Sequence, residues 1–109
     1  MIANVPSLRI PLPMAQIDSF CRRWNIARLD IFGSALRDDF RADSDVDLLA
    51  TYAPEARWSL LDRVRMKFEL EAMVGRKVDL LNRRALEKAR THARAAAILA
   101  QAEPLYVQS

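Results

Sequence analysis

The order of apolar patterns along the chain predicts an α/β (α+β) fold, in which a small mixed β-sheet of three to four strands is flanked by helices. Stretches with helical spacing alternate with short apolar stretches that are typical of strands. The chain has 109 residues, of which 51% are hydrophobic and 28% charged, so it can bury one core. We therefore predict a single domain over residues 1–109, with an irregular segment at 1–12.

The first helix is predicted to begin at Pro13, because proline suits the first turn of a helix. Apolar side chains then recur at helical spacing, at Met14, Ile17, Cys21 and Trp24. Asn25 can end the helix in a left-handed conformation. The following sequence, ARLDIFG, alternates apolar and charged residues and predicts a strand that ends at Gly33-Ser34. SALRDDF then indicates a short helix or turn.

The middle of the chain predicts a second strand, VDLLATY, and a well-marked helix. Ser59 and Asp62 resemble a capping box at the start of this helix, and Gly75 suits its C-terminal end. Four residues form its apolar stripe, the face by which such a helix packs on a core: Leu61, Val64, Phe68 and Ala72.

The last third of the chain predicts a third strand, one helix and a short final strand or docked tail. KVDLLN is the third strand, and RRALEKARTHARAAAILAQAE is rich in strong helix formers. Pro104 is expected to stop that helix before LYV at 105–107. Its alanine-rich face is a candidate contact for a partner or a second copy of the chain.

Composition excludes several classes of protein. The net charge of +3, from 17 Lys+Arg against 14 Asp+Glu, is small, so nucleic-acid binding is not expected. Cys21 is the only cysteine, so an internal disulfide is excluded. No apolar run approaches the ~18 residues of a membrane span, and the first residues lack the pattern of a signal peptide. We expect a cytoplasmic protein.

Asp45 and Asp47 are candidate metal ligands. Residues i and i+2 of a strand point to the same face, so both carboxylates converge while Val46 points into the core. Two such carboxylates repel each other unless they share a cation, and hard oxygen ligands suit Mg²⁺. A calcium-binding EF-hand loop does not fit, because Leu48 and Pro54 stand where that loop needs Gly and Glu.

Two further features are candidates for the same site. A strand that turns at Gly33-Ser34 into a helix can offer backbone N–H groups to a phosphate, and Arg37 lies one turn further on. Asp79 lies between apolar residues on the predicted third strand, so its charge needs a partner or water. If that strand is beside the Asp45 strand, Asp79 joins the other two carboxylates.

The combined pattern resembles the DNA polymerase β-like nucleotidyltransferase superfamily. It consists of apolar-Gly-Ser, ten intervening residues, Asp-apolar-Asp-apolar, and apolar-Asp-apolar about thirty residues later. More closely, FGSALRDDFRADSDVDLLATY resembles the minimal nucleotidyltransferase (MNT) domain. The resemblance extends from about Arg23 through GRKVDLLNRRAL to AEPLYV. Asp38 departs from it, because many relatives have Gly there, but this variable turn is not expected to abolish activity.

The resemblance implies a role for each matching residue. Asp45 and Asp47 would hold Mg²⁺, with two ions expected, and Asp79 would complete the metal site and activate the attacking hydroxyl. Gly33 and Ser34 would hold the triphosphate of ATP. MNT proteins are commonly paired with small helical toxins of the HEPN type. The resemblance therefore implies an antitoxin that transfers AMP from ATP to a tyrosine of its toxin.

Three alternatives remain open from the sequence. The chain could neutralise a toxin by contact alone, with its aspartates secondary. It could modify a small molecule, although 109 residues can hardly form a deep acceptor pocket without an oligomer. It could also be a generic α/β domain with acidic turns, in which case Mg²⁺ and nucleotide would leave its melting temperature unchanged.

Overall fold

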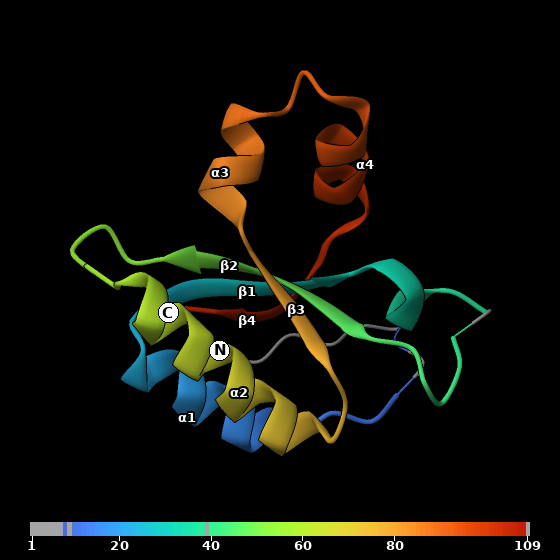
Figure 1. The fold of residues 1–109 in the computed structure, drawn as a ribbon, viewed down its shortest axis with the longest axis horizontal. Helices are drawn as coiled ribbons and strands as arrows, with labels where there is room; N and C mark the ends of the chain where they lie inside the picture. The colour runs from blue at the N-terminus through green and yellow to red at the C-terminus, as the bar shows by residue number, and fades with distance from the viewer. Residues whose placement is uncertain (1–7, 9, 39, 109) are drawn as a thin grey trace.

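The structure, a computed structural model, describes residues 8, 10–38 and 40–108 (Figure 1). Its elements are α1 Met14–Arg23, β1 Ile26–Phe32, the 3-10 helix η1 Gly33–Leu36, β2 Val46–Tyr52, α2 Leu60–Val74, β3 Val78–Asn82, α3 Arg83–Lys88, α4 Ala93–Gln101 and β4 Glu103–Val107. The predicted α/β class is confirmed. The segment predicted as irregular, 1–12, lies mostly outside the described residues, and residues 10–12 contain no helix or strand.

One four-stranded mixed sheet, in the order β3-β2-β1-β4, forms the centre of the fold. β1 pairs antiparallel with both β2 and β4, whereas β2 and β3 are parallel. Parallel neighbours need a crossover connection, and α2 supplies it. The first residues of β2 and β3 therefore lie at the same end of the sheet, beside the end of β1.

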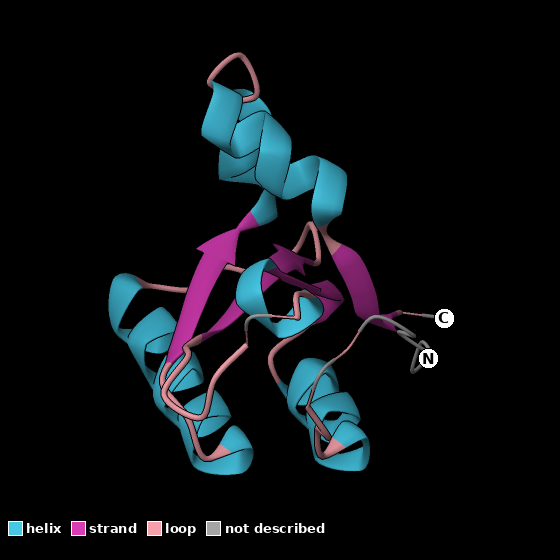
Figure 2. Ribbon diagram, turned by 90° about the vertical axis from the view of Figure 1, so that its right-hand side faces the viewer, coloured by secondary structure: helices cyan, strands magenta, loops and turns pink. Residues whose placement is uncertain are grey.

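Helices cover the sheet on two sides (Figures 1 and 2). α1 and α2 pack on one face, where the main core holds fully buried side chains such as Phe20, Leu48 and Leu70. α3 and α4 lie over the other face, where Phe32, Leu49 and Ile98 form a smaller apolar cluster. Strand residues alternate between these two clusters, as the pleat requires.

The predicted helix ends are confirmed. Pro13 immediately precedes α1, and Asn25 takes a positive φ of 51° after it. The Ser59 hydroxyl accepts a hydrogen bond from the Asp62 N–H while the Asp62 carboxylate accepts from the Ser59 N–H, and Gly75 ends α2 with φ 77°. Local chemistry therefore determines where these helices start and stop.

The predicted packing face of α2 is wrong. Leu61, Val64 and Phe68 are 60%, 36% and 60% exposed, and Ala72 is exposed too. Met66 and Leu70, on the opposite side of the helix, are fully buried. α2 is apolar on both sides, so its periodicity does not decide which side meets the sheet.

The long helix predicted after β3 is also corrected, because it is divided into α3 and α4 by a turn at residues 89–92. The turn folds α4 back beside α3. Leu86 and Leu99 then share the apolar cluster over the sheet, whereas one straight helix would carry them apart. The final strand, β4, starts at Glu103 and includes Pro104.

Candidate functional site

The candidate site lies where β1 ends and where β2 and β3 begin. Phe32, the last residue of β1, pairs with Asp47 of β2, and Asp47 pairs in turn with Asp79 of β3. Paired residues on neighbouring strands have side chains on the same face, about 5 Å apart. The sheet register thus brings the Gly-Ser turn and two aspartates together.

The side chain of Asp47 lies so close to the backbone at position 33 that glycine is favoured there. The φ of Gly33, +76°, lies in the left-handed region, which side chains with a Cβ rarely adopt. A Cβ at this position would collide with Oδ2 of Asp47 and stand 3.2 Å from its Cγ. Glycine is expected here because it lets a phosphate approach the backbone, and in the structure it also makes room for the Asp47 carboxylate.

The turn is tied to its surroundings by two hydrogen bonds. The Ser34 hydroxyl donates to the backbone carbonyl of Asp45 at 3.4 Å. The backbone N–H of Gly33 donates to Oε1 of Gln101 in α4 at 3.2 Å, so it is engaged here rather than free for an anion. Ser34 therefore links the turn to the start of β2, and Gln101 links it to α4.

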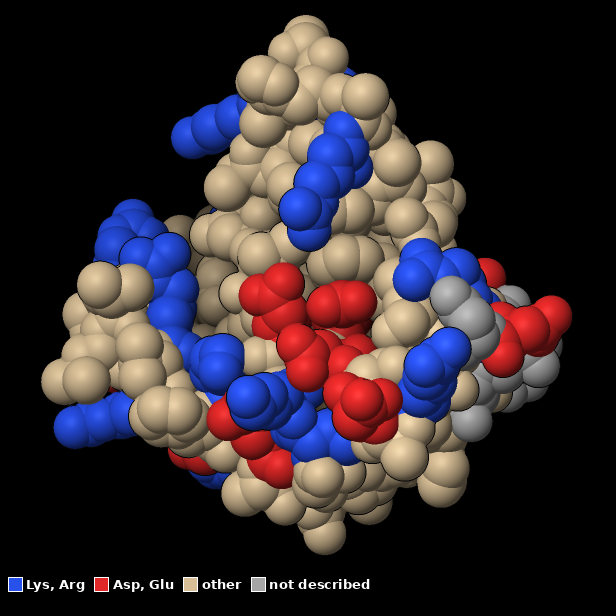
Figure 3. All heavy atoms as spheres, turned by 45° about the vertical axis from the view of Figure 1, so that its right-hand side comes forward, with Lys and Arg blue, Asp and Glu red and all other residues tan. Residues whose placement is uncertain are grey.

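The three predicted carboxylates are electrostatic neighbours. Asp45 is exposed and precedes β2, Asp47 is half-buried on β2, and Asp79 is exposed on β3. Burial raises the pKa of Asp47, and repulsion from Asp79 and then Asp45 raises it further. Acidic side chains gather in the middle of this side of the molecule, with basic side chains around them (Figure 3). Such an arrangement favours a bound cation.

Cationic side chains approach the same carboxylates. Arg37, which follows η1, and Arg94 of α4 both act to lower the pKa of Asp47, against the larger upward effects. Both line an open cavity of about 280 Å³ together with Gly33, Asp47 and Gln101. The cavity therefore combines a carboxylate with arginines, which suits a metal-bound phosphate chain.

The family follows from comparison with known proteins. Residues 14–101 match the family model of the nucleotidyltransferase domain. The chain belongs to this nucleotidyltransferase family. A solved structure of a candidate minimal nucleotidyltransferase is 34% identical, with a TM-score of 0.64 over 84% of this chain and 88% of the other. The minimal form of the domain, suggested by the sequence pattern, is confirmed.

Two further relatives are informative. A candidate protein adenylyltransferase of Methanocaldococcus jannaschii is 45% identical over 51% of this chain and 58% of its own length, so the chain spans little more than half of it. A solved complex holds a tri-AMPylated HEPN toxin of Shewanella oneidensis with its MNT antitoxin. Its matching chain is 16% identical, with a TM-score of 0.57 over 87% of this chain and 70% of the other. At that identity the likeness concerns the fold alone.

The carboxylates of the candidate site determine whether this nucleotidyltransferase domain can hold Mg²⁺. Within the described ranges, no three Asp, Glu, His or Cys side chains are grouped closely enough to hold a metal ion by themselves. Mg²⁺ at nucleotide sites is usually held by one or two carboxylates together with substrate phosphates. Asp45 and Asp47, whose charges repel each other, provide such carboxylates. The residues therefore fit Mg²⁺ that enters together with a nucleotide.

Two residues of α4 contribute to the candidate site of this nucleotidyltransferase domain, and the sequence did not predict them. Arg94 and Gln101 come from a helix that was predicted as part of a longer one, and nothing in their spacing indicates the active site. His92, the single histidine, is an exposed residue that precedes α4.

No helix in the described part of the chain has both the length and the apolar character that crossing a membrane requires.

Proposed function

We propose that this chain is an antitoxin that transfers AMP from ATP to a tyrosine hydroxyl of a HEPN-type toxin. The observation that carries the proposal is the alignment of Asp47 with Asp79 across two parallel strands, directly beside Gly33. Membership of the nucleotidyltransferase family supports the reaction type. The adenylyltransferase relative and the AMPylated toxin complex support the acceptor class.

The proposed reaction forms one bond and breaks one. The acceptor oxygen attacks the α-phosphorus of ATP, the bond from that phosphorus to the bridging oxygen breaks, and pyrophosphate leaves. Asp79 takes the proton of the hydroxyl as the general base. Arg37 and Arg94 would orient the phosphates, because both line the cavity beside Asp47, and Ser34, which follows Gly33 in the turn, would add its hydroxyl.

Mg²⁺ is part of the same proposal. Asp45 and Asp47 would hold it, with Asp79 as a further ligand, and it would stabilise the charge on the attacking and leaving oxygens. Burial first, and then repulsion from Asp79 and Asp45, raises the pKa of Asp47, and a bound cation would relieve the repulsive part. A cytoplasmic location belongs to the proposal as well, since the reaction consumes ATP.

A small-molecule acceptor is a weaker candidate. The cavity beside Asp47 has about 280 Å³ and is open to one side. Sites that enclose drug-sized ligands typically have 300–1,000 Å³. This cavity can receive the phosphates of a nucleotide but has no room for a second enclosed substrate, which favours an acceptor on a protein surface.

Intact-mass measurement tests the proposal. The chain is co-expressed with the product of the adjacent gene, which the proposal expects to be a HEPN-type toxin, and the purified pair is incubated with ATP and Mg²⁺. We expect the toxin to gain the mass of one or more AMP groups, at a residue that peptide mapping identifies as tyrosine. The double variant Asp45→Ala, Asp47→Ala should add none.

Two outcomes would contradict the proposal. Equal modification by the double variant would remove Asp45 and Asp47 from the active site. Neutralisation of the toxin with no gain in mass would favour the alternative that the chain acts by contact alone.

A further inference from the structure

The outer side of α2 exposes more large apolar side chains than the rest of the described chain together. Five large hydrophobic residues are exposed among the described ones, and four of them are on α2: Leu60, Leu61, Val64 and Phe68. Leu60, Val64 and Phe68 are spaced i, i+4, i+8, and Leu61 lies beside them, so the four form one stripe. We call these four residues the α2 stripe.

The α2 stripe is opposite the side by which α2 packs on the sheet. At 100° per residue, the centre of the stripe lies more than a quarter turn from Met66 and Leu70, which are fully buried. A helix that is apolar on both sides is usually enclosed on both sides. The apolar pattern of α2 thus predicts a second packing partner on its outer side.

The borders of the α2 stripe are basic. At 100° per residue, Arg65 lies next to one edge of the α2 stripe, and Arg63 and Lys67 lie next to the other edge. The acidic residues of α2 are engaged internally: Asp62 accepts from Ser59, Glu69 pairs with Arg23, and Glu71 pairs with Lys67, which leaves Lys67 paired as well. Arg63 and Arg65 form no ion pair with any described residue. An acidic partner would therefore be attracted to both borders.

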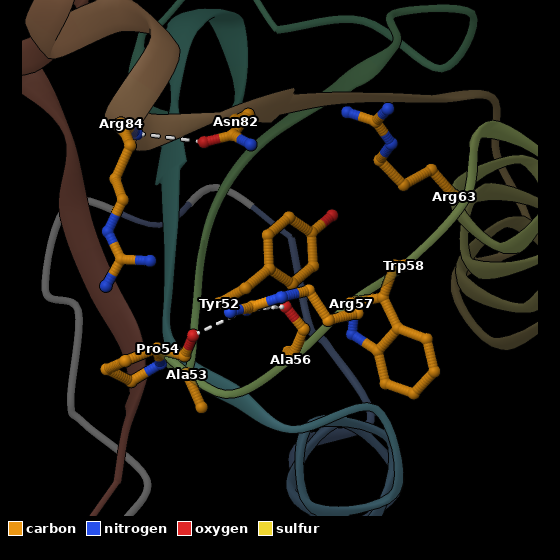
Figure 4. Close-up of a pocket in the computed structure, with 9 residues that line it drawn as sticks. All are labelled: Tyr52, Ala53, Pro54, Ala56, Arg57, Trp58, Arg63, Asn82 and Arg84. Atoms are coloured by element: carbon orange, nitrogen blue, oxygen red, sulfur yellow. Dashed lines mark hydrogen bonds between the residues drawn. The ribbon is translucent and has the colours of Figure 1, made fainter.

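An arginine-lined pocket adjoins the N-terminal end of the α2 stripe (Figure 4). Its volume is about 220 Å³, and Arg57, Arg63 and Arg84 surround the ring of Tyr52. A neighbouring apolar groove of about 270 Å³ shares Arg63 and is lined by Leu60, Val64 and Leu80. Pocket and stripe are therefore one continuous surface, and the pocket suits a single carboxylate better than a large ligand.

Charge decides between a second copy of this chain and a different protein. A two-fold symmetric contact would bring the α2 stripe against itself. Arg63 follows one border and Arg65 the other, and neither is in an ion pair with a described residue, so in either helix orientation these arginines would meet like charges, which is unfavourable. The surface instead matches a helix whose apolar stripe is bordered by Asp or Glu.

We propose that the α2 stripe and the adjoining arginine pocket form the surface on which the toxin docks, through a helix with an apolar stripe bordered by acidic residues. This inference rests on the proposed function for the identity of the partner. α2 leads through residues 75–77 into β3, which carries Asp79. α2 covers the face of the sheet opposite to Asp47 and Asp79, so a toxin helix docked on α2 leaves the cavity beside Asp47 open, and another part of the toxin has to reach around the start of β3 to present a tyrosine.

A charge placed in the α2 stripe tests the apolar part of the surface. Leu61→Asp combined with Phe68→Asp should weaken binding of the proposed HEPN-type toxin at least tenfold, because central apolar contacts dominate interfaces. Val107→Asp is the matched control: Val107 is the fifth exposed apolar residue, and it is on β4. If the double variant does not fold, Leu61→Ser with Phe68→Ser replaces it.

A charge reversal tests the basic borders. Arg65→Glu should weaken binding and reduce its salt dependence, whereas Lys88→Glu, an equal change of charge on α3, should do neither. Binding is measured by titration calorimetry with the purified toxin. Stabilisation by Mg²⁺ and ATP is measured separately and should be unchanged in all of these variants.

The outcomes separate docking from catalysis. If the stripe variant binds the toxin as tightly as the unchanged chain does, or if no complex forms at all, the docking surface is wrong. If docking depends on the stripe but no AMP is transferred, the proposed reaction fails while the surface stands. If AMP transfer persists with tight binding in the stripe variant, the reaction stands while the surface fails.

Discussion

Gly33 and Asp47 approach each other so closely that a side chain at position 33 would have to displace the Asp47 carboxylate. The two residues are joined by the register of the sheet, because Asp47 pairs with Phe32, which directly precedes Gly33. A Cβ on Gly33 would lie 3.2 Å from Cγ of Asp47 and closer still to its Oδ2. The conformation of the turn and the position of a candidate metal ligand therefore depend on each other.

Gly33→Ala is expected to impair both stability and AMP transfer. The positive φ alone costs about 1–2 kcal/mol for alanine. Displacement of the Asp47 carboxylate should reduce the rate of AMP transfer by about two orders of magnitude, because catalysis is sensitive to shifts of ~1 Å. Thermal unfolding and a mass-based transfer assay measure the two effects.

Gly75→Ala is the matched control for Gly33. Gly75 has nearly the same φ, +77°, but no atom lies within 4 Å of the position where its Cβ would be. The Gly75→Ala variant should lose stability as Gly33→Ala does, but it should keep the full rate of AMP transfer. If both variants lose activity equally, the contact with Asp47 is not what matters at Gly33.

Asp47→Asn is expected to stabilise the unbound protein at neutral pH. Burial and the charges of Asp79 and Asp45 raise the pKa of Asp47 above its ordinary 3.8, so the folded state holds the proton more firmly than the unfolded chain. The carboxyl group thus favours folding below pH 3.8, and that advantage is lost as the pH rises through the raised pKa. The melting temperature of the variant should exceed that of the unchanged protein at pH 7 and match it near pH 3.

Mg²⁺ provides a second test of the same carboxylate. Added Mg²⁺ with ATP should raise the melting temperature of the unchanged protein but barely affect Asp47→Asn. A variant that melts lower than the unchanged protein at pH 7 without Mg²⁺ would contradict the raised pKa.

Asp30→Ala is expected to destabilise the fold by about 3 kcal/mol. Asp30 is fully buried on β1, where its carboxylate pairs with Arg28 at 2.7 Å and with Arg83 at the start of α3. Its removal leaves Arg83, which is 20% exposed, without its buried partner. Asp18→Ala removes the exposed pair with Arg22 and should cost less than about 1 kcal/mol. Similar losses in chemical denaturation would show that the pair with Arg83 does not anchor α3.

Leu70→Ala and Leu61→Ala are expected to differ strongly, although both remove the same side chain from α2. Leu70 is fully buried, so its truncation should cost about 2–5 kcal/mol. Leu61 is 60% exposed, and its truncation should change the free energy of unfolding by less than about 0.5 kcal/mol. Urea unfolding of the isolated chain measures both. Reversed magnitudes would mean that the predicted α2 face, not the observed one, packs on the sheet.

Arg94→Ala is expected to raise the KM for ATP about tenfold while leaving the fold intact. Arg94 is exposed, lines the cavity beside Asp47 and opposes the negative charge there. Lys88→Ala removes a similar charge from α3, away from the cavity, and should leave KM unchanged. An unaltered KM in the Arg94 variant would exclude it from nucleotide binding.

The strands, the caps of α2 and the sequence positions of the three candidate aspartates could be predicted because their signals are local. Ser59, Asp62 and Gly75 act on neighbouring backbone groups, so the ends of α2 can be read from a few residues. The alternation around Asp45 and Asp47 similarly follows from the geometry of a single strand. Asp79 could be named because it repeats the same pattern on the next strand.

Other features could not be read from the sequence, because they depend on which surfaces meet. α2 carries apolar residues on two sides, and only the sheet decides that Met66 and Leu70 are buried while Leu61 and Phe68 are exposed. The turn at 89–92 has no strong local signal. The turn is stabilised because Leu86 and Leu99 pack against one apolar cluster over the sheet. That cluster includes Phe32 and Leu49, which are distant from both leucines in the sequence.

The sequence by itself determined the order of the strands, the first two helices with their caps and the residue types of the candidate site, since short-range hydrogen bonding and side-chain alternation control them. Only the tertiary structure decided that the Asp47 carboxylate lies where a side chain at position 33 would be. It also decided that Arg94 and Gln101 of α4 line the cavity beside Asp47 and that the α2 stripe is exposed. These depend on strand register and packing, which join residues distant in sequence.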